Sequence, residues 1–245
     1  MQALTHESTY TRRDPTGIIH RNRLAGVQYC VNRLGLGPTG SFAEFGCSNG
    51  FVMQTLQETV FAGKAWDFTG LDIDIELLEG GRGKGLPRTR FEPIDLNLPN
   101  EQLEPRFDVV MCVEVLEHVD QYENGLRTLF RGCKSGGCLL VGVPWEVGFP
   151  GTVKYLGRMA LRGSGTYAYF FDRRTKGEYL GALLRGKPTR NFREPPRGYW
   201  DMHLGFDTAE FEHFLLKEYA PPRAELLFKH STSAGFNRFW VFRKA

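Results

Sequence analysis

The sequence predicts an α/β fold: a Rossmann-like, doubly wound sheet of seven mostly parallel strands, with a helical and aromatic insertion after strand five. Short apolar strands alternate with helical stretches from Phe42 to Pro144, which is the pattern of a parallel sheet. A glycine-containing turn, Glu44 to Gly50, follows the first of these strands. The 245 residues, 41% of them hydrophobic, are enough for one well-buried domain with a modest insertion.

The N-terminal part is expected to form one helix before the sheet begins. Residues 1–20 are polar and irregular, whereas residues 21–36 carry apolar side chains at helical spacing: Leu24, Val27, Val31 and Leu34. The stretch from Gly35 to Gly40 ends that helix and leads into the first strand.

The turn after the first strand is built for close approach of a ligand to the backbone. Glu44 heads it, and Gly46 and Gly50 carry no Cβ atom. A helical run from Phe51 to Leu56 follows. The second strand, residues 68–74, ends in a carboxylate that we expect to face the same edge of the sheet.

The remaining elements follow in the order of a doubly wound sheet. The expected strands cover residues 91–96, 107–114, 136–144, 224–230 and 237–243, and the expected helices cover residues 121–133 and 208–219. Thr208 is a plausible N-cap of the last helix, whose apolar face is Phe211, Phe214 and Leu215. We therefore divide the single domain into residues 1–40 (N-terminal helical lid), 41–144 (core), 145–205 (insertion and substrate lid) and 206–245 (last helix and hairpin).

The insertion contains one basic helical segment, residues 152–162. Its basic residues, Lys154, Arg158 and Arg162, are spaced by four, and its apolar residues, Val153, Leu156 and Ala160, lie on another face. Such a helix fits an anionic membrane surface, an anionic substrate, or simply a solvated basic face over a packed helix.

Composition excludes several classes of protein. The net charge of +3 argues neither for nor against nucleic acid. No apolar run is long enough to span a bilayer, and the N-terminus lacks the features of a signal peptide. The five cysteines are scattered, and Cys112 and Cys138 fall in expected buried strands, which favours a reduced cytoplasmic protein.

The ordered motifs between Phe42 and Pro144 resemble the class I S-adenosylmethionine-dependent methyltransferases. The Glu114-Val-Leu-Glu-His118 segment is similar to a subgroup that includes ubiquinone-pathway O-methyltransferases and related small-molecule and glycan methyltransferases. The resemblance implies S-adenosylmethionine as cofactor. One departure is Ser48, which stands where the family usually has its middle glycine.

The resemblance also implies which residues hold that cofactor. The turn residues Glu44, Gly46, Ser48 and Gly50 would face its amino-acid part. Asp72 would accept from the two ribose hydroxyls, with Ile73 beside it and Asp74 as the rival carboxylate. Asp95 would accept from the adenine amino group unless it is a turn aspartate, with Leu96 on the ring, and Glu114 would lie near the sulfonium.

Two histidines are candidates for catalysis, His118 after the fourth strand and His203 before the last helix. A neutral histidine is a good general base near pH 7. If residues 114–118 are helical, Glu114, Glu117 and His118 share one face and could hold a divalent metal, with His203 as a fourth ligand. A helix N-terminus with favoured acidic residues explains the same pattern, and we do not favour a metal.

The expected activity is O-methylation of a small molecule or of a glycan or lipid-linked sugar. The aromatic residues of the insertion suit a sugar ring or a stacked base equally well. The alternatives are a metal-assisted RNA 2′-O-methyltransferase, a catalytically silent cofactor-binding protein, and a nucleotide-binding dehydrogenase. The last lacks a third glycine, because Met53 stands at the helix-packing position.

Overall fold

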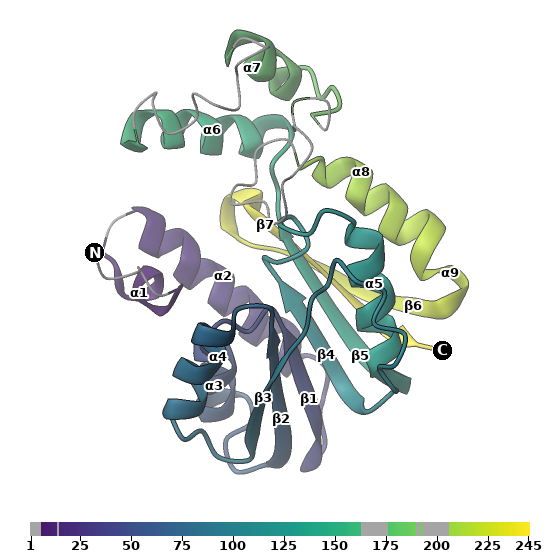
Figure 1. Ribbon diagram of the computed structural model, residues 1–245. Coiled ribbons are helices and arrows are strands. Elements are labelled where there is room, and N and C mark those ends of the chain that lie inside the picture. The colour runs from purple at the N-terminus through teal and green to yellow at the C-terminus, as the bar shows by residue number, and fades with distance from the viewer. Residues whose placement is uncertain (1–5, 14, 163–175, 190–191, 193–205) are drawn as a thin grey trace.

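The computed structural model describes residues 6–13, 15–162, 176–189, 192 and 206–245. Its centre is a seven-stranded sheet in the order β3-β2-β1-β4-β5-β7-β6 (Figure 1). The strands are β1 (Thr39–Phe45), β2 (Ala65–Asp72), β3 (Thr89–Pro93), β4 (Phe107–Val113), β5 (Cys133–Pro144), β6 (Ala224–Ser231) and β7 (Asn237–Lys244). The first five pair in parallel, and β7 is antiparallel to both β5 and β6. The predicted fold class is confirmed.

The helices cover both faces of this sheet (Figure 1). They are α1 (His6–Thr11), α2 (Pro15–Asn32), α3 (Phe51–Thr59), α4 (Ile75–Gly83), α5 (Tyr122–Gly132), α6 (Gly148–Arg162), α7 (Lys176–Leu184), α8 (Thr208–His213), the π-helical η3 (Phe214–Tyr219) and α9 (Ala220–Arg223). A short 3₁₀ turn, η4 (Ser233–Gly235), joins β6 to β7. None of the described helices combines the length and the hydropathy needed to cross a bilayer.

Two apolar layers hold the helices on the sheet. Val31 of α2, Met53 of α3 and Leu78 of α4 pack with one face of the strands. Leu129 of α5 and Phe211 of α8 pack with the other face. Each of these side chains is fully buried between its helix and the sheet.

Several element boundaries differ from the sequence-based expectations. The first long helix already begins at Pro15, because polar residues before Leu24 still take helical turns, and it ends at Asn32. The last long helix does not use Thr208 as its N-cap: Asp207 caps it, with its Oδ1 accepting from the backbone N–H groups of Ala209 and Glu210. Thr208 is instead buried, where its hydroxyl donates to the Pro144 carbonyl.

The basic segment of the insertion is oriented differently from the expectation. Residues 152–162 are helical, within α6, but the Lys154 ammonium group points inward. It lies 3.1 Å from Glu146 Oε1 and 2.7 Å from the Phe236 carbonyl oxygen. Val153 and Leu156 are exposed instead, so the solvated basic face, one of the three alternatives, is wrong at Lys154.

Candidate cofactor site

The turn after β1 is shaped as much by packing as by ligand access. Gly46 and Gly50 have φ values of 76° and 74°, in the left-handed region that favours glycine. A Cβ atom on Gly46 would lie 2.1 Å from Val115 Cγ2. Packing against Val115 therefore requires glycine at this position. The sequence had predicted glycine here for a different reason, the close approach of a ligand to the backbone.

Asp72, at the end of β2, holds this turn in place. Its Oδ2 accepts from the backbone N–H of Ser48 at 2.7 Å, and its Oδ1 accepts from the backbone N–H of Asp74 at 3.0 Å. An ionised carboxylate offers about four acceptor positions, so two remain for a ligand. Asp74 caps α4 with its Oδ1, which accepts from Glu76 and Leu77. Asp74, the rival to Asp72, is therefore the N-cap of α4.

Three buried polar atoms of the turn have no hydrogen-bond partner among the described residues: Glu44 Oε2, Ser48 Oγ and Asn49 Oδ1. Glu44 is only 6% exposed, and burial, with nearby Asp72 adding to it, raises its pKa to about 8. Buried polar atoms are almost always hydrogen-bonded in folded proteins. This cluster therefore favours a ligand that donates hydrogen bonds and carries positive charge.

The N-terminal helices cover the turn and enclose a cavity against it. Its lining includes Tyr10 and Arg23 from those helices, Glu44 and Asn49 from the β1 side, and Phe51 at the start of α3. The Tyr10 and Phe51 rings pack 4.9 Å apart between centroids. Three of these residues, Tyr10, Arg23 and Asn49, were not predicted. Tyr10 and Arg23 lie far from any motif, so no sequence signal marked them.

Arg23 and Glu114 form a buried ion pair across this cavity region, with 2.8 Å between Nη1 and Oε2. Arg23 also donates to the Tyr10 hydroxyl at 2.7 Å, and Asn237 Nδ2 lies 2.6 Å from Glu114 Oε1. Although burial opposes it, the neighbouring Tyr10 and Glu114 raise the pKa of Arg23 above its usual value. The guanidinium therefore stays charged and supplies the positive pole of a site that is otherwise acidic.

Residues 114–118 form a turn, so the conditional helical face of Glu114, Glu117 and His118 does not exist. Glu114 has a φ of 60°, which takes the chain out of β4 in a direction that a helix cannot continue, and α5 begins only at Tyr122. His118 Nε2 lies 4.0 Å from Glu117 Oε1. Burial raises the pKa of Glu117 well above its usual range, and Glu114 adds to this effect.

No group of three His, Cys, Asp or Glu side chains within the described ranges is arranged to hold a metal ion. A metal on Glu114 would have to displace both Arg23 and Asn237. His203, the fourth residue of the conditional metal set and the other candidate base, lies outside the described residues.

The expected adenine end of the site lies beyond β3. Asp95 Oδ1 accepts from the backbone N–H of Asn97 at 2.8 Å, which is the turn geometry that the sequence analysis weighed as the alternative. Leu96 is buried, whereas Ile73 is 51% exposed beside Asp72. The structure therefore leaves one apolar side chain available to pack against a ring at this edge.

Residues 43–139 match the family described as "Methyltransferase domain". This match supports the class I S-adenosylmethionine-dependent methyltransferases as the family of this chain. The matched range begins within β1 and ends within β5, so it contains the turn, Asp72 and Glu114. The family resemblance that the sequence suggested is confirmed.

The methyltransferase domain is similar to proteins of known sequence and structure. It is 30% identical over 98 residues to the mitochondrial ubiquinone biosynthesis O-methyltransferase of Schizosaccharomyces pombe. This match spans 40% of the chain and 35% of that relative, about a third of its length. A solved protein from Pyrococcus horikoshii OT3 superposes with a TM-score of 0.53 at 12% identity, over 95% of this chain and 93% of that one. The CurJ carbon methyltransferase superposes with a TM-score of 0.57 at 13% identity, over 97% of this chain and 57% of that one. The two structures support the fold.

Proposed function

We propose that this chain transfers a methyl group from S-adenosylmethionine to a hydroxyl oxygen of a small-molecule or glycan acceptor. The observation that carries the proposal is the cavity between the Gly46–Gly50 turn and the N-terminal helices, in which Glu44 Oε2 is buried without a hydrogen-bond partner among the described residues. The cofactor supplies an activated methyl group on a sulfonium. Its two cationic centres and one carboxylate match a site with several carboxylates and one arginine.

The residues of the site would divide the cofactor between them. Glu44 and the turn would hold the ammonium end, and Arg23 is placed to attract the carboxylate. Asp72 has acceptor positions left for the ribose hydroxyls, and the exposed Ile73 would pack on the adenine near Asp95. Glu114, held by Arg23 and Asn237, would lie on the sulfonium side.

Little acid–base chemistry is required of the protein beyond removal of one proton. Displacement at the methyl carbon needs an aligned acceptor and a site from which water is excluded. We propose that His118 or His203 accepts the hydroxyl proton, which is worth roughly 10²–10⁴ in rate. Residues 1–40 would then cover the cofactor, and residues 145–205 would cover the acceptor.

The distant ubiquinone-pathway relative is an O-methyltransferase by name, which supports oxygen as the methylated atom. A metal-assisted RNA 2′-O-methyltransferase and a catalytically silent cofactor-binding protein are the alternatives. RNA binding would weaken steeply as salt increases, whereas binding of a small acceptor would not. Loss of activity with EDTA would favour the metal-assisted alternative.

The cofactor proposal is tested by calorimetry with S-adenosylhomocysteine. The wild type should bind at micromolar level, and Asp72→Ala should weaken binding by roughly 2–3 kcal/mol because a charge-assisted contact is lost. Asp74→Ala is the matched control: it removes the cap of α4 and should leave affinity within about threefold. Equal losses in both variants, or no binding by the wild type, would contradict the assignment.

The catalytic proposal needs an acceptor panel, with release of S-adenosylhomocysteine as the readout. His118→Ala and His203→Ala should each be compared with the wild type for turnover and for cofactor affinity. Substitution of the residue that acts as base should lower turnover and leave cofactor affinity nearly unchanged. Full activity in both variants would mean that neither histidine is the base, and catalysis would then rest on positioning alone.

A further inference from the structure

The helix pair α6–α7 has an apolar interior of its own. Tyr155 and Tyr179 are 4% and 2% exposed, with 5.2 Å between their ring centroids, and Leu183 is fully enclosed with them. Phe192 packs on Tyr179 at the same centroid distance. The pair therefore packs on an apolar interior that is separate from the two layers on the sheet.

A second set of apolar side chains on α6 points to solvent. Phe149, Val153 and Leu156 are 79%, 39% and 50% exposed. Their spacing of four and three residues places them on one side of the helix. The nearest lysine of that helix, Lys154, is at the same time turned inward onto Glu146. A helix that turns its lysine in and its large apolar residues out presents a surface suited to an apolar partner.

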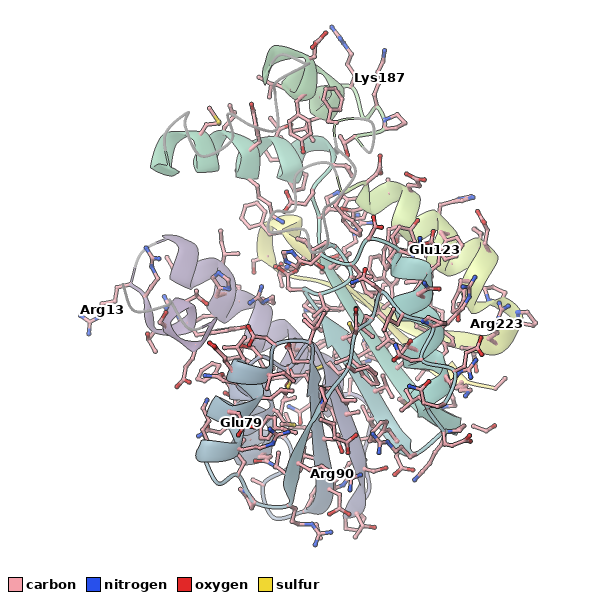
Figure 2. The ribbon with its side chains drawn as sticks, viewed as in Figure 1. Arg13, Glu79, Arg90, Glu123, Lys187 and Arg223 are labelled. Carbon is pink, nitrogen blue, oxygen red and sulfur yellow. The ribbon has the colours of Figure 1, made fainter. Side chains whose placement is uncertain are left out.

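The neighbouring helix adds one apolar residue and two cations. Leu184, the last residue of α7, is 65% exposed, and exposed Arg185 and Lys187 follow it. Neither cation forms an ion pair with any residue that the structure describes. Figure 2 shows Lys187 at the outer end of the helix pair, on the side remote from α3 and α4. Glu178, more than one turn earlier on α7, is also exposed.

We propose that the exposed apolar residues of this helix pair, Phe149, Val153, Leu156 and Leu184, and its exposed cations Arg185 and Lys187 together dock on an anionic lipid bilayer; we call these six residues the docking face. Exposed aromatic and aliphatic side chains on a helix lying in the interface gain from burial at the headgroup boundary. Cations on the same helix pair are attracted by anionic lipid, at about 1 kcal/mol each. A second copy of this chain fits less well, because a two-fold contact would bring the same cations face to face.

The position of the helix pair in the fold determines which side of the protein would face the bilayer. The helix pair follows directly from β5, at the carboxyl ends of the parallel strands (Figure 1). Docking would therefore turn the edge of the sheet that carries Asp72 and Glu114 toward the bilayer, whatever reaction takes place there.

The test is co-sedimentation of the full chain with vesicles of phosphatidylcholine alone and of phosphatidylcholine with 30% phosphatidylglycerol, a composition of about one anionic lipid in three. The wild type should bind the anionic vesicles at least about tenfold more tightly and should be released by high salt. Phe149→Glu with Leu156→Glu should lower the partition coefficient about a hundredfold. Arg185→Gln with Lys187→Gln should lower it about thirtyfold.

Matched controls sit elsewhere on the surface. Leu226→Glu alters an apolar residue of β6 whose exposure, 37%, is close to that of Val153, and Lys217→Gln removes an exposed cation from η3. Both controls should bind like the wild type, and all variants should keep the wild-type circular dichroism. The proposal is overturned if the wild type does not sediment with anionic vesicles, or if the double variants bind as well as the controls. A dimer in analytical ultracentrifugation that only the Phe149/Leu156 variant loses would assign the face to a second copy instead.

Discussion

Replacing Glu44 by Gln should change the pH dependence of stability in the ligand-free protein. Glu44 is 6% exposed, and its pKa is raised from 4.5 to about 8, first by burial and then by Asp72. A raised carboxyl pKa means that the folded state holds a proton that the unfolded chain releases. The stabilisation is fully present below pH 4.5 and is lost as the pH rises through 8.

The magnitude follows from these two values. Between pH 6 and pH 8 the unfolded chain has released the proton while the folded chain largely keeps it. A difference of one bound proton lowers the free energy of unfolding by about 1.4 kcal/mol for each pH unit, and by less near the folded pKa. The free energy of unfolding of the wild type should therefore fall by about 2 kcal/mol between pH 6 and pH 8 because of this group. The Gln side chain does not titrate and keeps an oxygen that can accept from the backbone N–H of Met53, which bonds the carboxylate.

Urea denaturation at pH 6 and pH 8 measures this difference. The difference in free energy of unfolding between the wild type and the Glu44→Gln variant should change by about 2 kcal/mol between the two pH values. The contributions of the other titrating groups cancel in this difference. Glu58→Gln, at an exposed position of α3, should follow the wild type. Parallel pH profiles for the wild type and Glu44→Gln would refute the burial argument.

Three further substitutions test how the site and its surroundings are held. Gly46→Ala should destabilise the fold by roughly 3 kcal/mol or more in denaturant unfolding, because of the positive φ and the contact with Val115; a loss below about 1 kcal/mol would contradict this packing. Thr208→Val should cost about 3 kcal/mol, since the buried hydroxyl bonds two backbone groups of the β5 end, and a neutral result would show that those bonds are absent. Glu7→Gln removes a partly exposed ion pair with Lys84, so hydrogen exchange within α1 should accelerate while the global Tm changes by only a degree or two; unchanged exchange would mean that this pair does not hold α1.

The fold could be predicted because its elements are short and their patterns are strong. The turn at Glu44–Gly50, the carboxylate after β2 and the apolar β4 all lie in a stretch where chain order sets position in the sheet. The sequence favoured Asp72 over its rival Asp74, although both lie at the end of the same expected strand. Only the backbone shows that one binds the turn and the other caps α4.

The unpredicted parts depend on contacts between distant segments. Tyr10 and Arg23 reach the cavity because α1 and α2 fold back over the turn, and neither residue belongs to a motif. The exposed side of α6 was misjudged because helical spacing separates two faces without saying which one is buried. Glu146, which binds Lys154 on the inner side, lies two residues beyond the end of β5.

The measurement that tests the central claim most directly is a crystal structure of this chain with S-adenosylhomocysteine. The account predicts the ligand in the cavity under α1 and α2, with its ribose hydroxyls on Asp72, its amino group near Glu44 and its carboxylate near Arg23. A ligand bound elsewhere, or bound here with Asp72 still engaged only by Ser48 and Asp74, would contradict the account.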